Sequence, residues 1–389
     1  MSDTGGGHRA SAQAISEAIH TLFPQQYCTI IEDIWKRHTP WPINRLPKTY
    51  PWLSGPGQPL WKMMWTGSTR LPADRLVLPA ITPLLESRAV RYLKEAGPDL
   101  IVSVHPLFNR LGLLWANRAG LKVPFVTVVT DMVSIHPLWI DPGVTRCLVS
   151  TDEARHLALK WGMPPQKIKL CGQPVSLKFA EIPRHNFNIR QKFGLNPAQP
   201  TILLVGGGEG TGPIFDIARA IARSVPPAQL LIVCGRNESL KARLQTVVWE
   251  IPTRIYGFVD NMPDLMAAAD VLITKAGPGT LSEAFIAGLP TIIFGYIPGQ
   301  EAGNVAYVQQ HQAGVYAEEP AEIVHLLQTW FHPADNTLEK MARNAGRLAQ
   351  PTASLQIAAE LSNLINPEPD IAPLISCQAT QLAASRIIR

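Results

Sequence analysis

Short apolar runs rich in β-branched residues alternate with helical stretches along the chain, and this alternation restricts the fold more than any other feature. In the first half, strands are expected in "DLIVSVH" at 99–105, "PFVTVVTD" at 124–131 and "TRCLVS" at 145–150, with a helix at 109–119. Strands that alternate with helices indicate mostly parallel sheets. We therefore expect an α/β fold built on doubly wound, Rossmann-like sheets.

The second half repeats the alternation. It opens with "QPTILLVGGGEGTG" at 199–212, an apolar run that ends in a glycine loop and leads into a helix at 214–224. Further strands are expected at 229–235, 253–259, 270–277 and 290–296, and helices at 336–348 and 352–364. We predict two domains, 1–175 and 190–365, and a loosely held tail at 366–389. Two facing sheets of this kind would bind their ligands in the cleft between them, beyond the carboxyl ends of the strands.

Composition is that of a globular protein. The chain has 389 residues, of which 46% are hydrophobic and 17% charged. No apolar run reaches the ~18 to 20 residues of a membrane-spanning helix. The five cysteines are scattered without zinc-like spacing, which suits a reducing compartment, so we expect a cytoplasmic location. Neither half contains an Asp-x-Asp pair, and we expect neither a metal ion nor any other cofactor.

Charge and tryptophan are concentrated in one segment. No acidic residue lies between Asp33 and Asp74, and this stretch holds half of the 10 tryptophans together with several Lys and Arg residues. Trp favours the membrane–water interface, and each Lys or Arg near an anionic leaflet contributes about 1 kcal/mol. The residues expected to meet an anionic membrane surface are Trp52, Trp61, Lys62 and Trp65. The alternative is a Pro-rich loop whose tryptophans pack on their own domain; no nucleic-acid-binding motif accompanies the basic residues.

A glycine turn followed by a histidine, "GGGH" at Gly5–His8, stands just before an expected helix at 9–19. The positive end of a helix disfavours an imidazolium, so His8 would stay neutral and able to accept a proton. The glycines leave room for reactants to approach closely. Asp131, at a strand end, is a candidate for orienting the ring. The alternative is a histidine that only caps its helix.

A turn of this kind is expected to follow a buried strand, yet only Met1 precedes Ser2. The first strand of a doubly wound sheet is central, and its loss would leave neighbouring strands with unpaired edges. We therefore expect an upstream apolar segment to belong to the protein. A shortened, impaired chain is the alternative.

The loop "VGGGEGTGP" can form a cradle for phosphate at a helix N-terminus, with Gly207 and Gly208 in the turn. It is not a Walker loop, because Pro213 follows Gly212 where Lys would be needed. It also lacks the spacing of nicotinamide-dinucleotide binders. A tight structural turn is an equally good interpretation.

A second loop lies in "ITKAGPGTLSEAFIAGLP" at 273–290. Gly277 and Gly279 make the turn, Thr280 or Ser282 can begin a helix, and Glu283 would lie in its first turn. A carboxylate in that position can accept hydrogen bonds from ribose hydroxyls. The alternative is a Glu that only complements the helix dipole.

The third loop is "PGQEAGN" at 298–304, where Gln300 and Glu301 begin another helix and could hydrogen-bond a sugar. A capped helix start is again the alternative. Together the three loops describe a pocket for a nucleotide sugar.

Several of these motifs also resemble a known family. "SDTGGGHRASA", "VVTD" with "HPLW" at 136–139, "ITKAGPGTLSEA" and "PGQEAGN" are similar to motifs of the monogalactosyldiacylglycerol synthases. These belong to a family 28-like group of glycosyltransferases that includes bacterial diacylglycerol glucosyltransferases and the enzyme that forms lipid II. The similarity spans roughly residues 1 to 365, in the expected order.

The resemblance implies a GT-B fold of two Rossmann-like domains and an inverting transfer of a hexose, galactose in this branch, from a UDP-sugar to 1,2-diacylglycerol. His8 would be the general base, and diacylglycerol would enter from the membrane side of the first domain. The enzyme would associate peripherally with a membrane. The residues implied in donor binding are Gly207, Gly208, Gly277, Gly279, Thr280, Glu283, Gln300 and Glu301.

Helix N-termini and loop amides would stabilise the negative charge on the diphosphate as it leaves, with Lys275 or Arg236 as candidate cations.

Two other functions stay open. One is a diacylglycerol glucosyltransferase that uses UDP-glucose, because no residue separates the two hexoses. The other is a non-catalytic, membrane-associated UDP-sugar binder, if the N-terminus is truly truncated.

Overall fold

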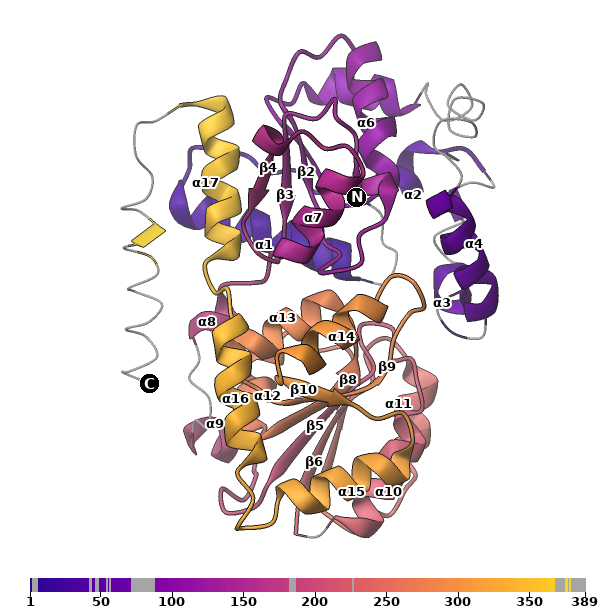
Figure 1. The fold of residues 1–389 in the computed structure, drawn as a ribbon, viewed down its shortest axis with the longest axis vertical. Coiled ribbons are helices and arrows are strands. Elements are labelled where there is room, and N and C mark those ends of the chain that lie inside the picture. Colours follow the sequence, from indigo (N-terminus) through magenta and orange to yellow (C-terminus); the bar gives the residue numbers. More distant parts are fainter. Residues whose placement is uncertain are drawn as a thin grey trace. The chain divides into compact units, whose positions relative to one another are not determined.

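The computed structural model divides into two compact units, each built on one parallel sheet, as the alternation of strands and helices predicts. It describes residues 1, 6–41, 44–45, 49–53, 55, 57–70, 88–181, 187–225, 227–367, 375–376 and 378. The first unit is drawn from Met1–Leu177, Pro298–Gln300 and Thr352–Cys377, and the second from Lys178–Ile297 and Glu301–Pro351. Figure 1 labels their helices and strands.

The first unit has a four-stranded sheet in the order β1-β2-β3-β4, with every neighbouring pair parallel. Residues 88–96 form a further helix of this unit. Its other elements are α1 (Gly7–Leu22), α2 (Ile34–His38), α3 (Tyr50–Leu53), α4 (Gln58–Arg70), β1 (Ile101–Ser103), α6 (Leu107–Arg118), β2 (Phe125–Val128), η2 (Pro137–Trp139), β3 (Arg146–Val149), α7 (Asp152–Lys160), η3 (Pro165–Lys167), β4 (Ile168–Leu170) and α17 (Ala353–Ile365).

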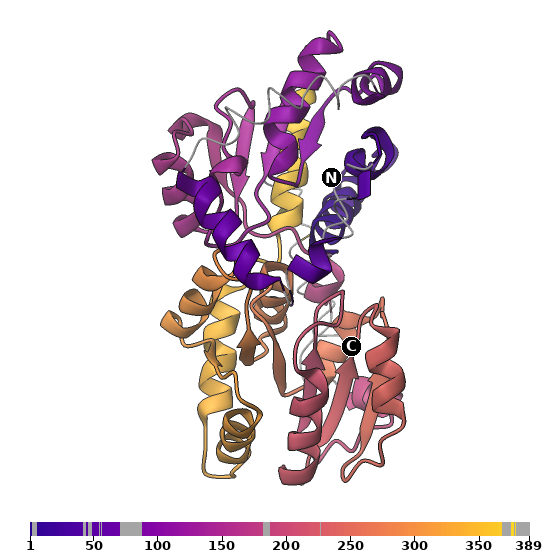
Figure 2. The ribbon, with the colours of Figure 1, turned by 90° about the vertical axis from the view of Figure 1, so that its right-hand side faces the viewer.

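The second unit has a six-stranded parallel sheet in the order β10-β9-β8-β5-β6-β7. Its helices lie on both sides of the strands (Figure 2). The elements are α8 (Lys178–Glu181), α9 (Phe187–Lys192), β5 (Thr201–Val205), α10 (Ile214–Ser224), β6 (Gln229–Val233), α11 (Glu238–Gln245), β7 (Thr253–Tyr256), α12 (Met262–Ala268), β8 (Val271–Lys275), α13 (Pro278–Ala287), β9 (Thr291–Gly295), α14 (Ala302–Gln310), β10 (Gly314–Tyr316), α15 (Pro320–Trp330) and α16 (Thr337–Leu348).

Burial on both faces explains the unbroken apolar strands of the second sheet. All five residues of β5 are buried, and so are all five of β6. Alternate residues of β5, such as Ile202 and Leu204, pack with the apolar faces of α10 and α15 in one cluster. A strand covered on both faces loses the alternation of apolar and polar residues that a half-exposed strand would show.

The C-terminal helix α17 belongs to the first unit, although the sequence analysis ended the second domain at residue 365. Ile357 and Leu361 of α17 pack with Ile15 of α1 and with the buried valines of β2. α1 and α17 contact each other and cover one face of the first sheet. The chain therefore returns to its first unit after completing the second, which no local pattern in the sequence indicates.

Two further differences concern elements that the sequence analysis did not predict. Residues 58–70, expected as part of a membrane segment or a Pro-rich loop, form helix α4 with a proline near its start. Two three-residue edge strands, β4 and β10, complete the two sheets. Runs this short carry too little periodicity to be recognised. The tail at 366–389 and residues 2–5 lie largely outside the described residues, and the statements about them stay predictions.

A buried carboxylate ties α17 to the sheet. Glu360 accepts hydrogen bonds from Arg146 Nε at 2.9 Å and from Lys169 Nζ at 2.5 Å. Its side chain is 10% exposed. Burial raises the pKa of Glu360, but the hydrogen bonds from Lys169 and Arg146 outweigh it, so the pKa lies below its usual value.

We expect Glu360→Gln to lower the free energy of unfolding by about 1 to 2 kcal/mol at pH 7, because two charge-assisted hydrogen bonds are weakened. Because the folded-state pKa is depressed, this stabilisation exists above the unfolded pKa and disappears as the pH falls through the folded one. Denaturant titrations at pH 7 and pH 3 measure both effects. Glu339→Gln, on the exposed ion pair with Arg343, is the matched control and should change stability by less than about 0.5 kcal/mol. Equal losses in the two variants would contradict the assignment.

Candidate functional site

The carboxyl ends of β5, β8 and β9 carry the three loops singled out in the second half of the sequence. Each loop leads directly into the N-terminus of a helix: α10, α13 and α14, respectively. In a parallel sheet these ends lie at one edge, where exposed backbone amides and helix dipoles favour an anion. The fold thus brings the three loops to the same edge of one sheet.

The loop after β5 has a shape that requires glycine. Gly207 has φ 72° and Gly210 φ 58°, which are left-handed conformations. A Cβ on Gly210 would overlap the carbonyl oxygen of Cys234, and one on Gly235 would overlap the carbonyl of Gly208. Arg236 N donates to the Gly208 carbonyl at 2.9 Å. The loops after β5 and β6 therefore pack backbone against backbone, which leaves the turn rigid.

The loop after β8 begins α13 earlier than the sequence analysis expected. Gly277 is the N-cap and Pro278 the first helical residue, so Gly279 and Thr280 lie in the first turn. Glu283 consequently lies in the second turn, and its predicted first-turn position was wrong. Proline is favoured at the first helical position because its missing N–H has no partner there in any case.

Glu283 is nevertheless chemically unusual. Burial raises its pKa to about 7. Within the described part of the chain it has neither a hydrogen bond nor an ion pair. A partly buried carboxyl group without such a partner has unused capacity to accept hydrogen bonds from the hydroxyl groups of a ligand.

Glu301 is 6% exposed and forms the N-cap of α14. Its Oε2 accepts from Ile297 N at 2.8 Å. Burial raises the pKa of Glu301, while nearby Lys275 and the Ile297 hydrogen bond act in the opposite direction. In the same helix, Asn304 donates from Nδ2 to the Ala276 carbonyl at 2.8 Å, and its buried Oδ1 has no hydrogen-bond partner in the part of the chain that the structure describes. These contacts tie the start of α14 to the end of β8.

The structure distinguishes the two candidate cations. Arg236 Nη1 is paired with Glu209 at 2.9 Å, and its guanidinium lies over the Phe258 ring, 4.6 Å from the centroid. Lys275 ends β8, and its side chain lies 3.7 Å from where a Cβ on Gly207 would be. Both cations therefore lie beside the glycine loop, but Arg236 is already paired with Glu209 of that loop.

In the first unit, His8 lies in the first turn of α1, after Gly6 in a left-handed conformation at φ 77°. Its Nδ1 is 3.0 Å from Thr130 Oγ1, just beyond β2. The His105 ring lies edge-on at 4.6 Å and the Trp139 ring at 6.3 Å, between centroids. The turn thus brings His8 to the carboxyl edge of the first sheet.

Burial lowers the pKa of His8 to about 4, with a hydrogen bond to the Val104 backbone opposing the shift. Burial likewise lowers the pKa of His105, which is 5% exposed. The direction agrees with the neutral imidazole that the sequence analysis expected, but burial is the main cause, where the helix dipole had been invoked. The His8 imidazole is therefore uncharged at neutral pH.

The side chain that forms a hydrogen bond with the His8 ring is that of Thr130. It is not that of the neighbouring Asp131, the candidate named from the sequence. Asp131 accepts from Trp139 Nε1 at 2.6 Å and from Gln300 Nε2 at 3.1 Å. Gln300 belongs to the first unit in this structure, whereas Glu301 belongs to the second. Thr130 was missed because a threonine at a strand end carries no functional signal of its own.

The predicted membrane residues lie on α3 and α4. Trp52 is 54% exposed, and Lys62 is also exposed. Trp61 and Trp65 are half-buried, with ring centroids 6.1 Å apart, and Trp65 packs edge-on against His136 at 4.6 Å. Among the described residues no helix is long and apolar enough to cross a membrane. α4 does present exposed apolar side chains, namely Leu60, Met63 and Met64.

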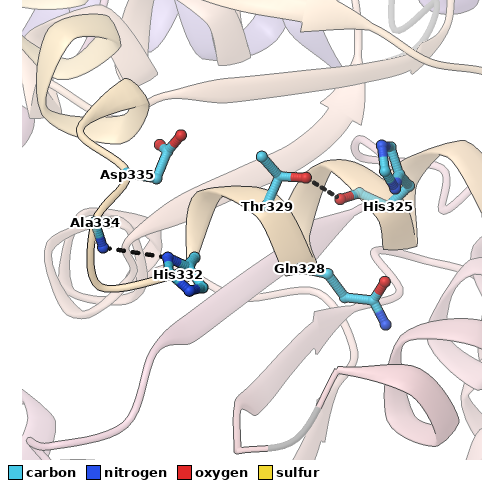
Figure 3. A pocket seen from close by; sticks show the side chains of 6 residues that line it. All are labelled: His325, Gln328, Thr329, His332, Ala334 and Asp335. Atoms are coloured by element: carbon cyan, nitrogen blue, oxygen red, sulfur yellow. Dashed lines mark hydrogen bonds between the residues drawn. The ribbon is translucent and has the colours of Figure 1, made fainter.

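A hollow on the second unit lies away from all of these loops (Figure 3). It is lined by His325, Gln328 and Thr329 of α15 and by His332, Ala334 and Asp335 of the following turn. Its polar groups are engaged locally, since Ala334 N donates to His332 Nδ1 and Thr329 donates to the His325 carbonyl. No group of His, Cys, Asp and Glu suited to a metal ion occurs in the described ranges. We assign this hollow no role.

Solved structures identify the fold, and a family model identifies the class. MurG from Acinetobacter baumannii superimposes with a TM-score of 0.53 at 17% identity, covering 73% of this chain and 79% of that one. MnaA from S. aureus, solved with UDP, gives a TM-score of 0.56 at 15% identity, covering 75% and 83%. The family model for the glycosyltransferase family 28 C-terminal domain matches residues 201–361. The chain is a glycosyltransferase with the GT-B fold.

The family follows from closer relatives. The family model for monogalactosyldiacylglycerol (MGDG) synthase matches residues 8–175. The chloroplastic monogalactosyldiacylglycerol synthase of Spinacia oleracea is 42% identical over 374 residues, which cover 94% of this chain and 72% of the relative. Monogalactosyldiacylglycerol synthase 1 of Arabidopsis thaliana is 41% identical over 388 residues, covering 97% and 72%. The chain belongs to the monogalactosyldiacylglycerol synthase family, as the motifs indicated.

The pKa of Glu283 makes donor binding testable by pH. If its carboxylate accepts ribose hydroxyls, binding of UDP-galactose should tighten between pH 6 and pH 8, because the acceptor form dominates only above pH 7. The expected change is up to about tenfold in Kd, measured by calorimetry. UDP-galactose suits this test because its diphosphate, esterified at both ends, does not titrate in that range.

The Glu283→Gln variant is the control for this measurement. It keeps an acceptor oxygen but cannot ionise, so the pH dependence should disappear while UDP-galactose still binds. An unchanged pH dependence in Glu283→Gln would assign the titration to another group.

Proposed function

We propose that this chain transfers galactose from UDP-galactose to the hydroxyl of 1,2-diacylglycerol with inversion, giving a monogalactosyldiacylglycerol. The observation that carries this proposal is the relationship to enzymes named monogalactosyldiacylglycerol synthases, at 42% identity over 94% of the chain. The residues discussed above supply groups that such a reaction needs: a proton acceptor, a place for a diphosphate and hydrogen-bond acceptors for a sugar.

The second unit would hold the donor. Amides of the glycine loop at Gly207 and Gly208 and the N-terminus of α13, from Gly277 to Thr280, would face the diphosphate. Lys275 would add a positive charge as the diphosphate leaves. Glu283 would accept from the ribose. Neither a metal ion nor another cofactor enters this scheme.

Gln300 and Glu301 would contact the hexose. Glu301 is held at the N-cap of α14 by Ile297 N, and the buried Oε1 of Gln300 has no hydrogen-bond partner among the described residues. Carboxylate and amide groups can distinguish sugar hydroxyls by hydrogen bonding, and a site built for one hydroxyl disfavours an analogue that leaves its groups unpaired.

His8 of the first unit would be the general base. It would take the proton of the diacylglycerol hydroxyl as the oxygen attacks the anomeric carbon, while the diphosphate leaves from the opposite face. An uncharged imidazole can accept this proton, and its low pKa keeps it uncharged at neutral pH.

The experiment that tests the function is an assay of the purified full-length chain with diacylglycerol vesicles and labelled UDP-galactose or UDP-glucose. Labelled monogalactosyldiacylglycerol with the β configuration is the expected product. A preference for UDP-glucose would show that UDP-galactose is not the donor. Binding of UDP-sugars without any product would indicate a non-catalytic binder.

His8→Ala should lower kcat by about 10² to 10⁴, the usual contribution of a positioned base, and leave the Kd for UDP-galactose within about twofold. His20→Ala is the matched control, because His20 lies on the same helix, is exposed and contacts Thr29. Equal activity of the His8→Ala and His20→Ala variants would reject the role of His8.

We further propose that α4 contacts the membrane through Leu60, Met63 and Met64, which are 41%, 66% and 49% exposed, with Lys62 beside them. Removing both methionine side chains in Met63→Ser/Met64→Ser should weaken binding to anionic vesicles by about tenfold or more, measured by co-sedimentation. Val248→Ser, at a 90% exposed apolar residue of the second unit, should have no effect. Equal vesicle binding by the double variant and the unmodified chain would exclude α4 as the contact.

A further inference from the structure

The His8 ring has one hydrogen-bonding side chain, the hydroxyl of Thr130, within the described residues. The Nδ1–Oγ1 distance is 3.0 Å, and Thr130 is 4% exposed. The two residues lie 122 positions apart in the chain and meet because α1 and β2 belong to one unit. The ring also has a hydrogen bond to the Val104 backbone, whose carbonyl can only accept. The Thr130 contact is on Nδ1, so a base that accepts a proton on Nε2 needs the ring hydrogen on Nδ1.

Thr130 is itself held in place by buried groups from the two following strands. Gln173 Nε2 donates to the Thr130 carbonyl at 3.0 Å, and Ser150 Oγ donates to Gln173 Oε1 at 2.7 Å. Ser150 also lies 3.3 Å from the Val129 carbonyl. Ser150 and Gln173 are 2% and 5% exposed. Because the side-chain oxygen of Gln173 accepts from Ser150, the NH₂ group of Gln173 faces Thr130. The backbone of Thr130 is thereby tied to the ends of β3 and β4.

A neutral imidazole carries its proton on one nitrogen only, and the group bonded to that nitrogen sets which one. For Nε2 to accept a proton, Nδ1 must carry the hydrogen, and Thr130 Oγ1 must accept it. We propose that Thr130 is the positioning residue of the catalytic site: it holds His8 in the Nδ1–H tautomer and thereby directs the Nε2 lone pair at the attacking hydroxyl. This inference rests on the proposed function, in which His8 is the base.

The choice of a hydroxyl over a carboxylate has a chemical consequence. A carboxylate on Nδ1–H would stabilise the imidazolium strongly and favour a charged ring. A threonine hydroxyl can accept from Nδ1–H without placing a full negative charge beside the ring. The carboxylate of Asp131, which follows Thr130 in the sequence, accepts instead from the Trp139 indole and from Gln300. In this proposal the Thr130 hydroxyl orients the His8 ring, and no carboxylate hydrogen-bonded to Nδ1 stabilises the imidazolium.

The test is ¹⁵N NMR of the full chain labelled at histidine, at pH 7, where the two tautomers have distinct nitrogen shifts. His8→Gln assigns the His8 signals. We expect Nδ1–H in the unmodified chain and in Thr130→Ser, which keeps the hydroxyl, and a shift toward Nε2–H in Thr130→Val. Thr127→Val is the matched control, because Thr127 is a fully buried threonine of β2 whose hydroxyl donates to Asn109 Oδ1 at 3.2 Å. It should alter stability without changing the His8 tautomer.

Kinetics give the second readout. Thr130→Val should lower kcat by about 10- to 100-fold while KM for both substrates stays within about threefold, and Thr130→Ser should recover most of kcat. An Nε2–H tautomer in the unmodified chain, with Nδ1 accepting from Thr130 and the other nitrogen directed at the Val104 backbone, would overturn the proposal. So would a tautomer that Thr130→Val leaves unchanged.

The NMR readout needs no turnover, so it separates this proposal from the function on which it rests. An Nδ1–H tautomer that depends on Thr130, in a chain without transferase activity, would support the positioning and reject the function. Galactosyl transfer by a chain whose His8 tautomer is the same with and without the Thr130 hydroxyl would support the function and reject the positioning role of Thr130.

Discussion

Parallel pairing of the strands is the constraint on which the rest of this structure depends. Every strand of the two sheets runs in the same direction as its neighbours, so every strand ends at the same edge of its sheet. Loops that are distant in sequence, such as those after β5 and β9, are thereby brought to one edge, with helix N-termini behind them. An anion at that edge meets backbone amides and helix dipoles, with the side chain of Lys275 beside the glycine loop. In the first unit the same geometry brings Val104 and Thr130 to the ring of His8.

Burial then adjusts two titratable groups in opposite directions. It lowers the pKa of His8 to about 4 and raises that of Glu283 to about 7. In both cases the cause is the cost of a charge away from water. The imidazole is therefore neutral at physiological pH, while the carboxyl group is balanced between two states. In the function proposed above, the neutral imidazole would accept a proton and the carboxylate would accept hydrogen bonds from the ribose.

The two units are also joined by the path of the chain. After α16 the chain leaves the second unit, and α17 packs against α1 on the first sheet, with Glu360 paired to Arg146 and Lys169. The first unit therefore lacks part of its core until α17 has been synthesised and has packed against it. A truncation before residue 353 would remove part of the core that supports α1, and α1 carries His8.

The sequence by itself determined the α/β class, eight of the ten described strands and the glycine turns, because these follow from local periodicity and from backbone conformations that only glycine adopts freely. It also identified His8 and Glu283 as chemically distinctive. Only the tertiary structure decided that α17 belongs to the first unit, that Thr130 and not Asp131 contacts His8, and that Glu283 lies in the second turn of its helix. Contacts between residues more than a hundred positions apart leave no periodic trace in a chain, and the cost of burying a charge exists only once the surrounding side chains are in place.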